Sequence, residues 1–141
     1  MGRPDGYRLK AQDGKTLTGK SGALIRCRPD GTDPEVLCRG FVNLVELVFT
    51  PQGEMIGTDN FFQEPVGGLR DAIVDLAPGG LYPLSLEDEG TPQPMTGGPL
   101  PAISLFPAVA PSGLVRYEGV DRNNEFRGQL FSAQHNSRKV Q

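Results

Sequence analysis

Residues 24–32 read LIRCRPDGT, an apolar and β-branched run that ends in Pro29 and Gly31. Residues 47–54, LVFTPQGE, repeat this arrangement, and residues 73–80, IVDLAPGG, repeat it again. Proline followed within two residues by glycine suits a tight reversal of the chain, because proline presets φ and glycine accepts a positive φ. The repeat therefore predicts a series of short antiparallel hairpins, which is typical of β-propeller blades.

The composition favours the same fold class. The chain has 141 residues, of which 19 are glycine and 13 are proline, and these interruptions are too frequent for long helices. Hydrophobic residues make up 37% and charged residues 22%, so the low apolar share reflects glycine and proline rather than a disordered, highly charged polymer. We therefore expect an all-β fold.

The order of these segments suggests one domain, residues 1–141, that forms part of a β-propeller. Residues 1–22 are polar and glycine-rich, and residues 23–84 hold the hairpin blades. Residues 85–112 are expected to be a long Pro/Gly-rich connection without strands, because proline removes backbone donors. Residues 113–141 are expected to begin a further blade that is truncated. About 40 to 50 residues per blade would make this roughly three blades, too few to close a ring.

Charge and hydropathy exclude two classes of partner. The formal net charge is −3 and the arginines are scattered, so the sequence indicates no nucleic-acid binding. No apolar stretch approaches the roughly 20 residues of a membrane-spanning helix. The first residues, MGRPDGY, lack the apolar core of a signal peptide.

Two blocks of the chain resemble the quinoprotein glucose and sorbosone dehydrogenase family, and most of all its membrane-bound dehydrogenase branch. The first block carries the motifs RPDGT (28–32), GFVN (40–43), FTPQGE (49–54), TDN (58–60) and PGGLY (78–82). The second block carries APSGL (110–114), Tyr117 and FRGQLF (126–131). The likeness follows the order of the chain, and that order is more specific than any single motif.

The resemblance implies a six-bladed propeller, of which this chain is a fragment, in an extracytoplasmic or periplasmic setting. It implies pyrroloquinoline quinone (PQQ) over the central axis, calcium nearby, and a sugar or aldehyde substrate whose hydroxyl proton is removed by a histidine. The blade that carries this histidine has no counterpart here, and His135 lies at the wrong place to inherit the role. No catalytic residue is therefore assigned, and the remaining blades of the parent propeller become expected partners.

The resemblance also implies four binding residues. Asn43 corresponds to a cofactor-binding asparagine at the quinone rim, although Val42 replaces the arginine that precedes it in the family. Losing an arginine fork would remove charge-assisted bonds of about 1.5 to 3 kcal/mol each. Asp59, Asp71 and Tyr82 fall near the family's oxygen ligands for calcium, a metal that prefers such ligands.

Simpler interpretations compete with these assignments. Asp59 and Asn60 follow an apolar run and are more simply turn residues, and Asn43 is as well suited to cap a loop as to face a ligand. His135 has no second ligand at zinc spacing and is expected on the surface, while Ser112 lacks a nucleophile-elbow motif and is expected in a turn.

The two cysteines, Cys27 and Cys38, flank the first Pro-Gly turn. A hairpin could bring them face to face, or a change of register could turn them to opposite faces. Two buried free thiols are slightly favoured over a disulfide.

Two functions remain open at the level of sequence. One is a fragment of a PQQ-dependent sugar or aldehyde dehydrogenase, inactive by itself. The other is a non-catalytic β-propeller module that binds a carbohydrate or a protein, which fits the valine at position 42 and the missing histidine. Fold does not decide between them, because function depends on the site.

Overall fold

The computed structural model describes residues 6–64, 68–83, 97–120 and 125–141, and within these ranges it is all-β with no α-helix. The described strands are β1 (Tyr7–Lys10), β2 (Thr16–Gly19), β3 (Gly22–Arg26), β4 (Glu35–Phe41), β5 (Asn43–Phe49), β6 (Met55–Glu64), β7 (Gly68–Asp75), β8 (Ser104–Phe106), β9 (Pro111–Arg116), β10 (Leu130–Gln134) and β11 (Lys139–Val140). The prediction of an all-β fold is confirmed.

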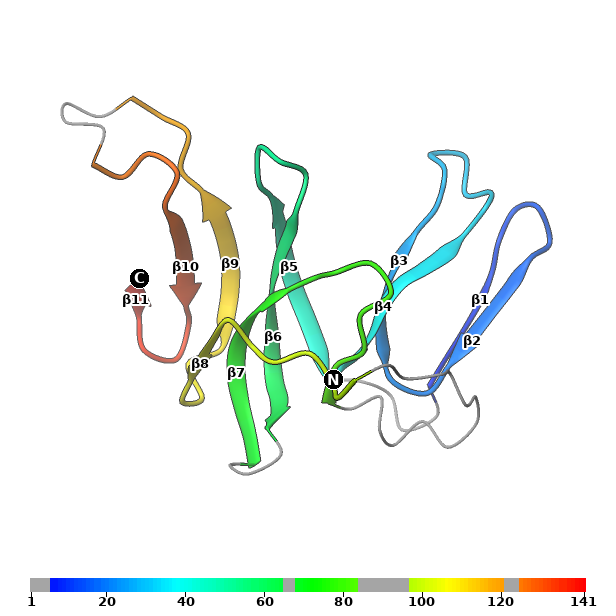
Figure 1. Cartoon of the computed structure of the whole chain (residues 1–141), viewed down its shortest axis with the longest axis horizontal. Coiled ribbons are helices and arrows are strands. Elements are labelled where there is room, and N and C mark those ends of the chain that lie inside the picture. Colours follow the sequence, from blue (N-terminus) through cyan, green and yellow to red (C-terminus); the bar gives the residue numbers. More distant parts are fainter. Residues whose placement is uncertain (1–5, 65–67, 84–96, 121–124) are drawn as a thin grey trace.

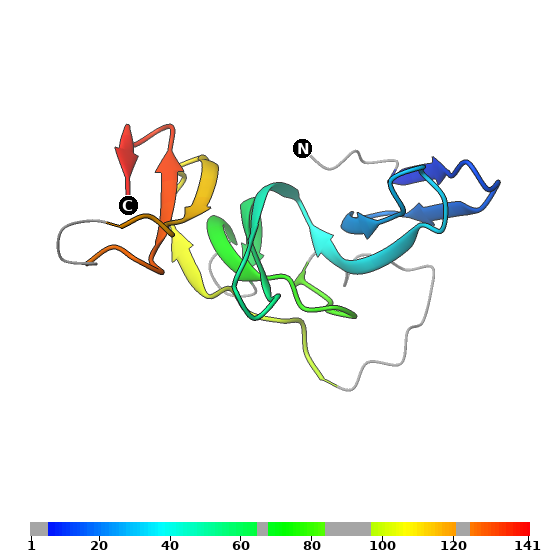
Figure 2. The ribbon, with the colours of Figure 1, turned by 90° about the horizontal axis from the view of Figure 1, so that it is seen from above.

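The strands form four antiparallel sheets, and none of them closes on itself. Two sheets are hairpins, β1–β2 and β3–β4. The largest is the meander β5–β6–β7–β8, and β9, β10 and β11 form the last sheet. Figure 1 shows the β1–β2 hairpin at one end of the molecule and the β9–β11 sheet at the other, and Figure 2 shows the same row of sheets from above. The first strand of the last sheet, β9, lies against β5 and β6.

The Pro-Gly signals form the turns that the sequence predicts. Residues 28–31 and 50–53 each close with a hydrogen bond from the glycine N–H to the carbonyl three residues earlier, at 2.9 Å in both cases. Gly31 has φ 79° and Gly53 has φ 88°, a conformation that glycine adopts without strain. Both turns join paired strands, β3 to β4 and β5 to β6, so these two hairpins are confirmed.

The third turn does not form a hairpin, which corrects the sequence-based expectation. Gly80 N–H donates to Ala77 O at 2.8 Å, but the chain then runs beside β4 instead of β7. Leu81 forms a parallel bridge with Arg39, and Tyr82 N–H donates to Arg39 O at 2.9 Å. A turn reverses the chain, but tertiary packing decides which neighbour the next residues meet.

Two further segments differ from the sequence-based boundaries. The polar segment 1–22 contains the hairpin β1–β2, in which Thr16 and Leu17 pair with Lys10 and Leu9. The connection 85–112 contains β8 and the start of β9 where no strand was expected. Residues 85–96 of that prediction lie outside the described residues.

A small core lies on one face of the central sheet. Its fully buried members include Ala72 and Val74 from β7, which alternate along the strand, and Phe41 at the end of β4. The Phe41 ring packs on Tyr82 with centroids 4.4 Å apart. This core fixes the end of β4 against the central sheet, and the predicted binding residues lie beside it.

Candidate functional site

Three of the four predicted binding residues gather at one end of the central sheet. Asn43 is the first residue of β5 and faces Asn60 of β6, while Asp59 pairs with Leu44 and with Ala72. Asp71 immediately precedes Ala72 on β7. Asp59 and Asn60 therefore lie inside a strand, and their interpretation as turn residues is wrong.

Asp59 is fully buried and holds the link between β4 and β5. Its Oδ1 accepts a hydrogen bond from Asn43 N–H at 2.7 Å, and its Oδ2 accepts one from Val42 N–H at 3.5 Å. Burial raises the pKa of this carboxyl to about 6, with a smaller contribution from the nearby Asp71, while the two backbone N–H groups act in the opposite direction. Burial therefore moves the pKa of Asp59 toward neutral pH.

Asp71 is 3% exposed and connects three segments. Its Oδ1 accepts from Phe61 N–H at 3.1 Å, and its Oδ2 accepts from Ala110 N–H at 2.7 Å. Phe61 has φ 66° and Ala110 has φ 49°, both in the left-handed region that non-glycine residues seldom occupy. Asp71 therefore stabilises a bulge in β6 and the bend before β9, two unfavourable backbone conformations.

Tyr82 lies in the core, and its hydroxyl has two backbone partners. It donates to Asp75 O and accepts from Ala77 N–H at 3.3 Å. Burial raises the pKa of the phenol well above its ordinary range. These contacts fasten the turn after β7 to the core.

The fit of these residues to calcium can be judged from their partners. Both oxygens of Asp59 and of Asp71 accept backbone hydrogen bonds, and the Tyr82 hydroxyl is engaged as donor and acceptor. Across the described ranges, no three His, Cys, Asp or Glu side chains come together as a metal site would require. The three predicted ligands are arranged as structural groups, and they do not fit a calcium site in this arrangement. Their role as ligands remains a prediction.

The predicted quinone rim, Asn43 with the preceding Val42, is likewise engaged within the fold. The backbone N–H groups of Val42 and Asn43 both point to Asp59, and valine supplies no donor from its side chain. Asn43 is half-buried at the start of β5. Val42 and Asn43 themselves therefore do not supply the charged fork that a quinone carboxylate would meet in the resembling family.

The two cysteines are free. Cys38 faces Leu24 in the β3–β4 pair, whereas Cys27 lies beyond the Arg26–Glu35 pair, so the register separates the two thiols along the hairpin. Cys38 is buried as expected, and burial raises the pKa of its thiol to about 11. Cys27 is exposed, which corrects the expectation that both would be buried.

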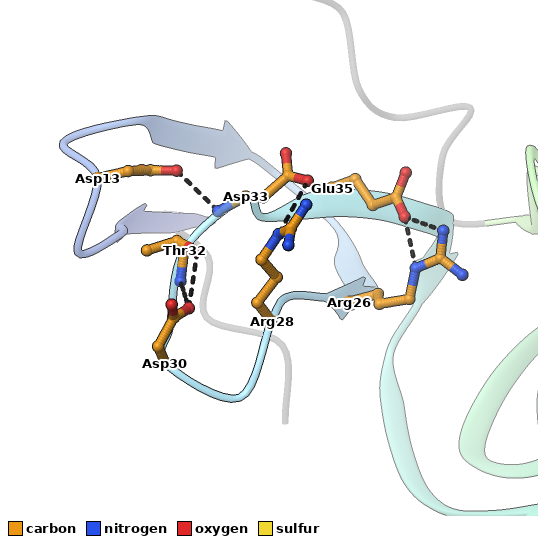
Figure 3. A network of polar contacts seen from close by, with 7 residues as sticks. All are labelled: Asp13, Arg26, Arg28, Asp30, Thr32, Asp33 and Glu35. Carbon is orange, nitrogen blue, oxygen red and sulfur yellow. Dashed lines mark hydrogen bonds and ion pairs between the residues drawn. The ribbon is translucent and has the colours of Figure 1, made fainter.

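A polar network joins the first two hairpins, and Figure 3 shows it at close range. Asp13 Oδ2 accepts from Asp33 N–H at 2.7 Å, and Gln12 N–H donates to Gly31 O at 3.2 Å. Within the second turn, Asp30 Oδ1 accepts from Thr32 N–H at 3.0 Å and from Thr32 Oγ1 at 2.7 Å. These bonds lower the pKa of Asp13, chiefly through Asp33 N–H, and the pKa of Asp30, chiefly through the Thr32 hydroxyl. The network positions the hairpins and offers no reactive group.

The remaining candidates lie on the last sheet. His135 is exposed, as predicted, in the turn between β10 and β11. Ser112 lies in strand β9 and not in a turn, and its hydroxyl donates to Ala133 O at 3.4 Å. Sequence reasoning did not select Arg138 and Lys139, which line one hollow with His135 and Ser112. Their only signal was the run RK three residues after the single histidine.

No family model, curated protein or solved structure matches the chain. The described residues also contain no helix with the length and apolarity that crossing a membrane requires.

Proposed function

We propose that this chain is a non-catalytic binding module, part of a β-propeller scaffold, that recognises a carbohydrate or a protein. One observation carries the proposal: the buried oxygens expected to serve calcium chemistry are engaged by backbone N–H and carbonyl groups. Asp59 and Asp71 are 0% and 3% exposed, so these carboxylates have little surface left for a ligand. Buried carboxylates that accept hydrogen bonds from backbone N–H groups stabilise the segments that connect strands. A binding scaffold has to hold such connecting loops in place.

The propeller part of the proposal is supported by how consecutive sheets meet. The central sheet is a four-stranded antiparallel meander, which is the composition of a propeller blade. The first strand of the next sheet, β9, lies against the first strand of the meander, β5. First strands of neighbouring blades meet in this way around a central axis, and the other blades of a parent propeller would continue the ring.

The second candidate function is a fragment of a PQQ-dependent sugar or aldehyde dehydrogenase, in a periplasmic setting. The observation in its favour is that Asn43, Asp59 and Asp71 converge at one end of the sheet. If the group were bound, the quinone would supply redox chemistry, and Asn43 would be the residue here to contact it.

The two functions are separated by calorimetric titration of the chain with calcium, with and without PQQ, followed by dye-reduction assays with aldoses and aldehydes. We expect no calcium-dependent heat and no dye reduction. A calcium signal that disappears in both Asp59→Asn and Asp71→Asn, together with dye reduction, would overturn the binding-module proposal. Asp30→Asn is the matched control, because Asp30 is exposed and bonds only within its own turn.

The binding function has its own readout. Saturation-transfer NMR with a panel of mono- and oligosaccharides, repeated in a chelator, is expected to show contacts that do not need calcium. Saccharide contacts that vanish with the chelator would contradict the proposal. The absence of any saccharide binding at millimolar concentration would rule out a carbohydrate ligand, and the proposed ligand would then be a protein.

A further inference from the structure

The strongest unassigned feature is an open hollow of about 490 Å³ beside the hairpin of β10 and β11. Its polar lining consists of Ser112, Gln134, His135, Arg138 and Lys139, and no aspartate or glutamate is among its lining residues. The chain as a whole has a net charge of −3, so a hollow with only cationic and neutral side chains departs from the average charge of the molecule. A local surplus of positive charge attracts anions over a distance of about a Debye length.

The turn that presents these side chains is held in an unusual conformation. Arg138 has φ 54°, a left-handed conformation that arginine rarely adopts. Its N–H donates to His135 O at 3.2 Å, which closes the turn. Unfavourable backbone conformations of this kind are concentrated at ligand sites. They persist only where the surrounding structure holds them in place.

That surrounding structure is visible on the other side of the turn. His135 N–H donates to Ala110 O and Asn136 N–H donates to Val109 O, both at 3.0 Å. The Asn136 side chain adds a bond from Nδ2 to Ala108 O at 3.1 Å. Three bonds to residues 108–110 therefore fix the turn, and with it Arg138, before any ligand arrives.

We propose that this hollow binds a tetrahedral oxyanion, phosphate or sulfate, either free or as an ester on a sugar. Arg138 supplies a planar fork of N–H donors that matches two oxygens of such an anion, and Lys139 supplies a point charge. His135, which lines the same hollow, supplies a further N–H donor. Neither Asp59 nor Asp71 lines the hollow, although Ala110 bonds to both Asp71 and His135. The inference does not depend on the function proposed above.

The test uses Arg138→Gly, a substitution that the backbone favours. Glycine adopts φ 54° without strain, so this variant loses the guanidinium while the turn keeps its shape and its stability. Isothermal titration of the chain with inorganic phosphate and inorganic sulfate, at low ionic strength, is expected to show binding that weakens about tenfold or more in Arg138→Gly. Lys139→Gln is expected to weaken it several-fold. Thermal unfolding of each variant is measured in parallel to show that the fold is retained.

The matched control is Arg127→Gln, which removes one positive charge from the loop at the other end of the same sheet. It is expected to leave anion affinity within about twofold, because Arg127 is not among the residues that line the hollow. Equal losses in Arg127→Gln and Arg138→Gly would overturn the site, since net charge alone would then explain the binding. No binding of either anion by the unsubstituted chain at about 10 mM would overturn it as well.

The source of the anion is distinguished by adding glucose 6-phosphate, glucose 6-sulfate and glucose to the titrations. Esters that bind more tightly than the inorganic anions indicate a sugar-borne anion, and equal affinities indicate a free anion. Glucose alone is expected not to compete. Competition by glucose that is unaffected by Arg138→Gly would contradict the proposal.

Discussion

Asp59 is a carboxyl group inside a sheet, and its ionisation couples the stability of the fold to pH. Burial raises its pKa to about 6 from an ordinary value near 3.8. The folded chain therefore binds this proton more tightly than the unfolded chain does, so the contribution of Asp59 to stability is largest below the unfolded pKa and is lost as pH rises through about 6. Two backbone N–H bonds hold the carboxylate in place at neutral pH in spite of this cost.

We expect the free energy of unfolding to rise by about 1 kcal/mol when pH falls from 7 to 5, because Asp59 becomes protonated in the folded state. The Asp59→Asn variant should lack this rise. Urea denaturation at pH 7, 6 and 5 measures both. All variants carry His135→Gln, since histidine is the other side-chain type that changes charge in this range. A stability that falls between pH 7 and pH 5 in the Asp59 protein would contradict the prediction.

Tyr82 gives a second prediction for a single residue. Removing its hydroxyl in Tyr82→Phe leaves Asp75 O and Ala77 N–H without their partner, and we expect a loss of about 1 to 3 kcal/mol in the free energy of unfolding. Chemical denaturation followed by fluorescence measures this loss. Tyr117→Phe is the control, because within the described residues the Tyr117 hydroxyl makes no hydrogen bond and its ring packs edge-on against Phe131. Similar losses in both variants would show that the Tyr82 hydroxyl has no special role.

At the scale of elements, carboxylates at the hairpin tips decide how neighbouring hairpins are joined. Asp13 at the tip of β1–β2 accepts the backbone N–H of Asp33, which itself has φ 51° before β4 begins. Gly31 lies close to the Gln12 side chain, where an added Cβ would meet Gln12 Cγ at 3.0 Å. The two tips are therefore docked by the Asp13 carboxylate, by the hydrogen bond from Gln12 N–H to Gly31 O and by this close approach, while each hairpin keeps its own internal pairing.

We expect Asp13→Ala to loosen this docking without unfolding either hairpin. Hydrogen exchange at the Gln12 amide, which donates to Gly31 O, should become several-fold faster, because exchange follows local opening. Heteronuclear NMR on the labelled chain measures it. In the control Asp30→Ala, the Thr32 amide should exchange faster while the Gln12 amide is unchanged. An unchanged Gln12 amide in Asp13→Ala would show that Asp13 does not hold the tips together.

At the scale of the whole molecule, four open sheets leave several strand edges unpaired. Neither edge of the last sheet is paired with a further strand within the described residues, and Val115 on its β9 edge is 56% exposed. Val45 on β5 is 41% exposed. Unpaired edges with exposed β-branched residues are templates for pairing with another chain.

We therefore expect the chain to self-associate as its concentration rises, and we expect Val115→Lys to reduce that association. Lysine on an edge strand opposes pairing because a charge would be brought against the partner strand. Sedimentation velocity over a range of concentrations measures the effect. Val120→Lys is the control, since Val120 is 83% exposed and lies outside the strands. A chain that remains monomeric at every concentration, or equal effects of both substitutions, would contradict this prediction.

The sequence by itself determined the strands that end in Pro-Gly turns. Pro29 with Gly31 and Pro51 with Gly53 encode their turns locally, because a fixed φ and a tolerated positive φ need no distant partner. The all-β class follows from the same local signals. A local turn signal does not predict which strand the chain meets next. The turn at Pro78 forms as expected, but the residues after it lie beside β4 and not beside β7.

Only the tertiary structure decided what the polar residues do. The pair Asp59-Asn60 resembles a turn in the sequence, but Asp59 is a buried residue inside β6. Its hydrogen-bond partners, Val42 and Asn43, lie 17 and 16 positions away, so no local sequence pattern could indicate them. Asp71 meets Ala110 across 39 positions, and the cationic hollow unites Ser112 with Arg138 and Lys139. Local preferences fix turns and strands, but a carboxylate or a guanidinium acquires its role from groups that only folding brings within hydrogen-bond distance.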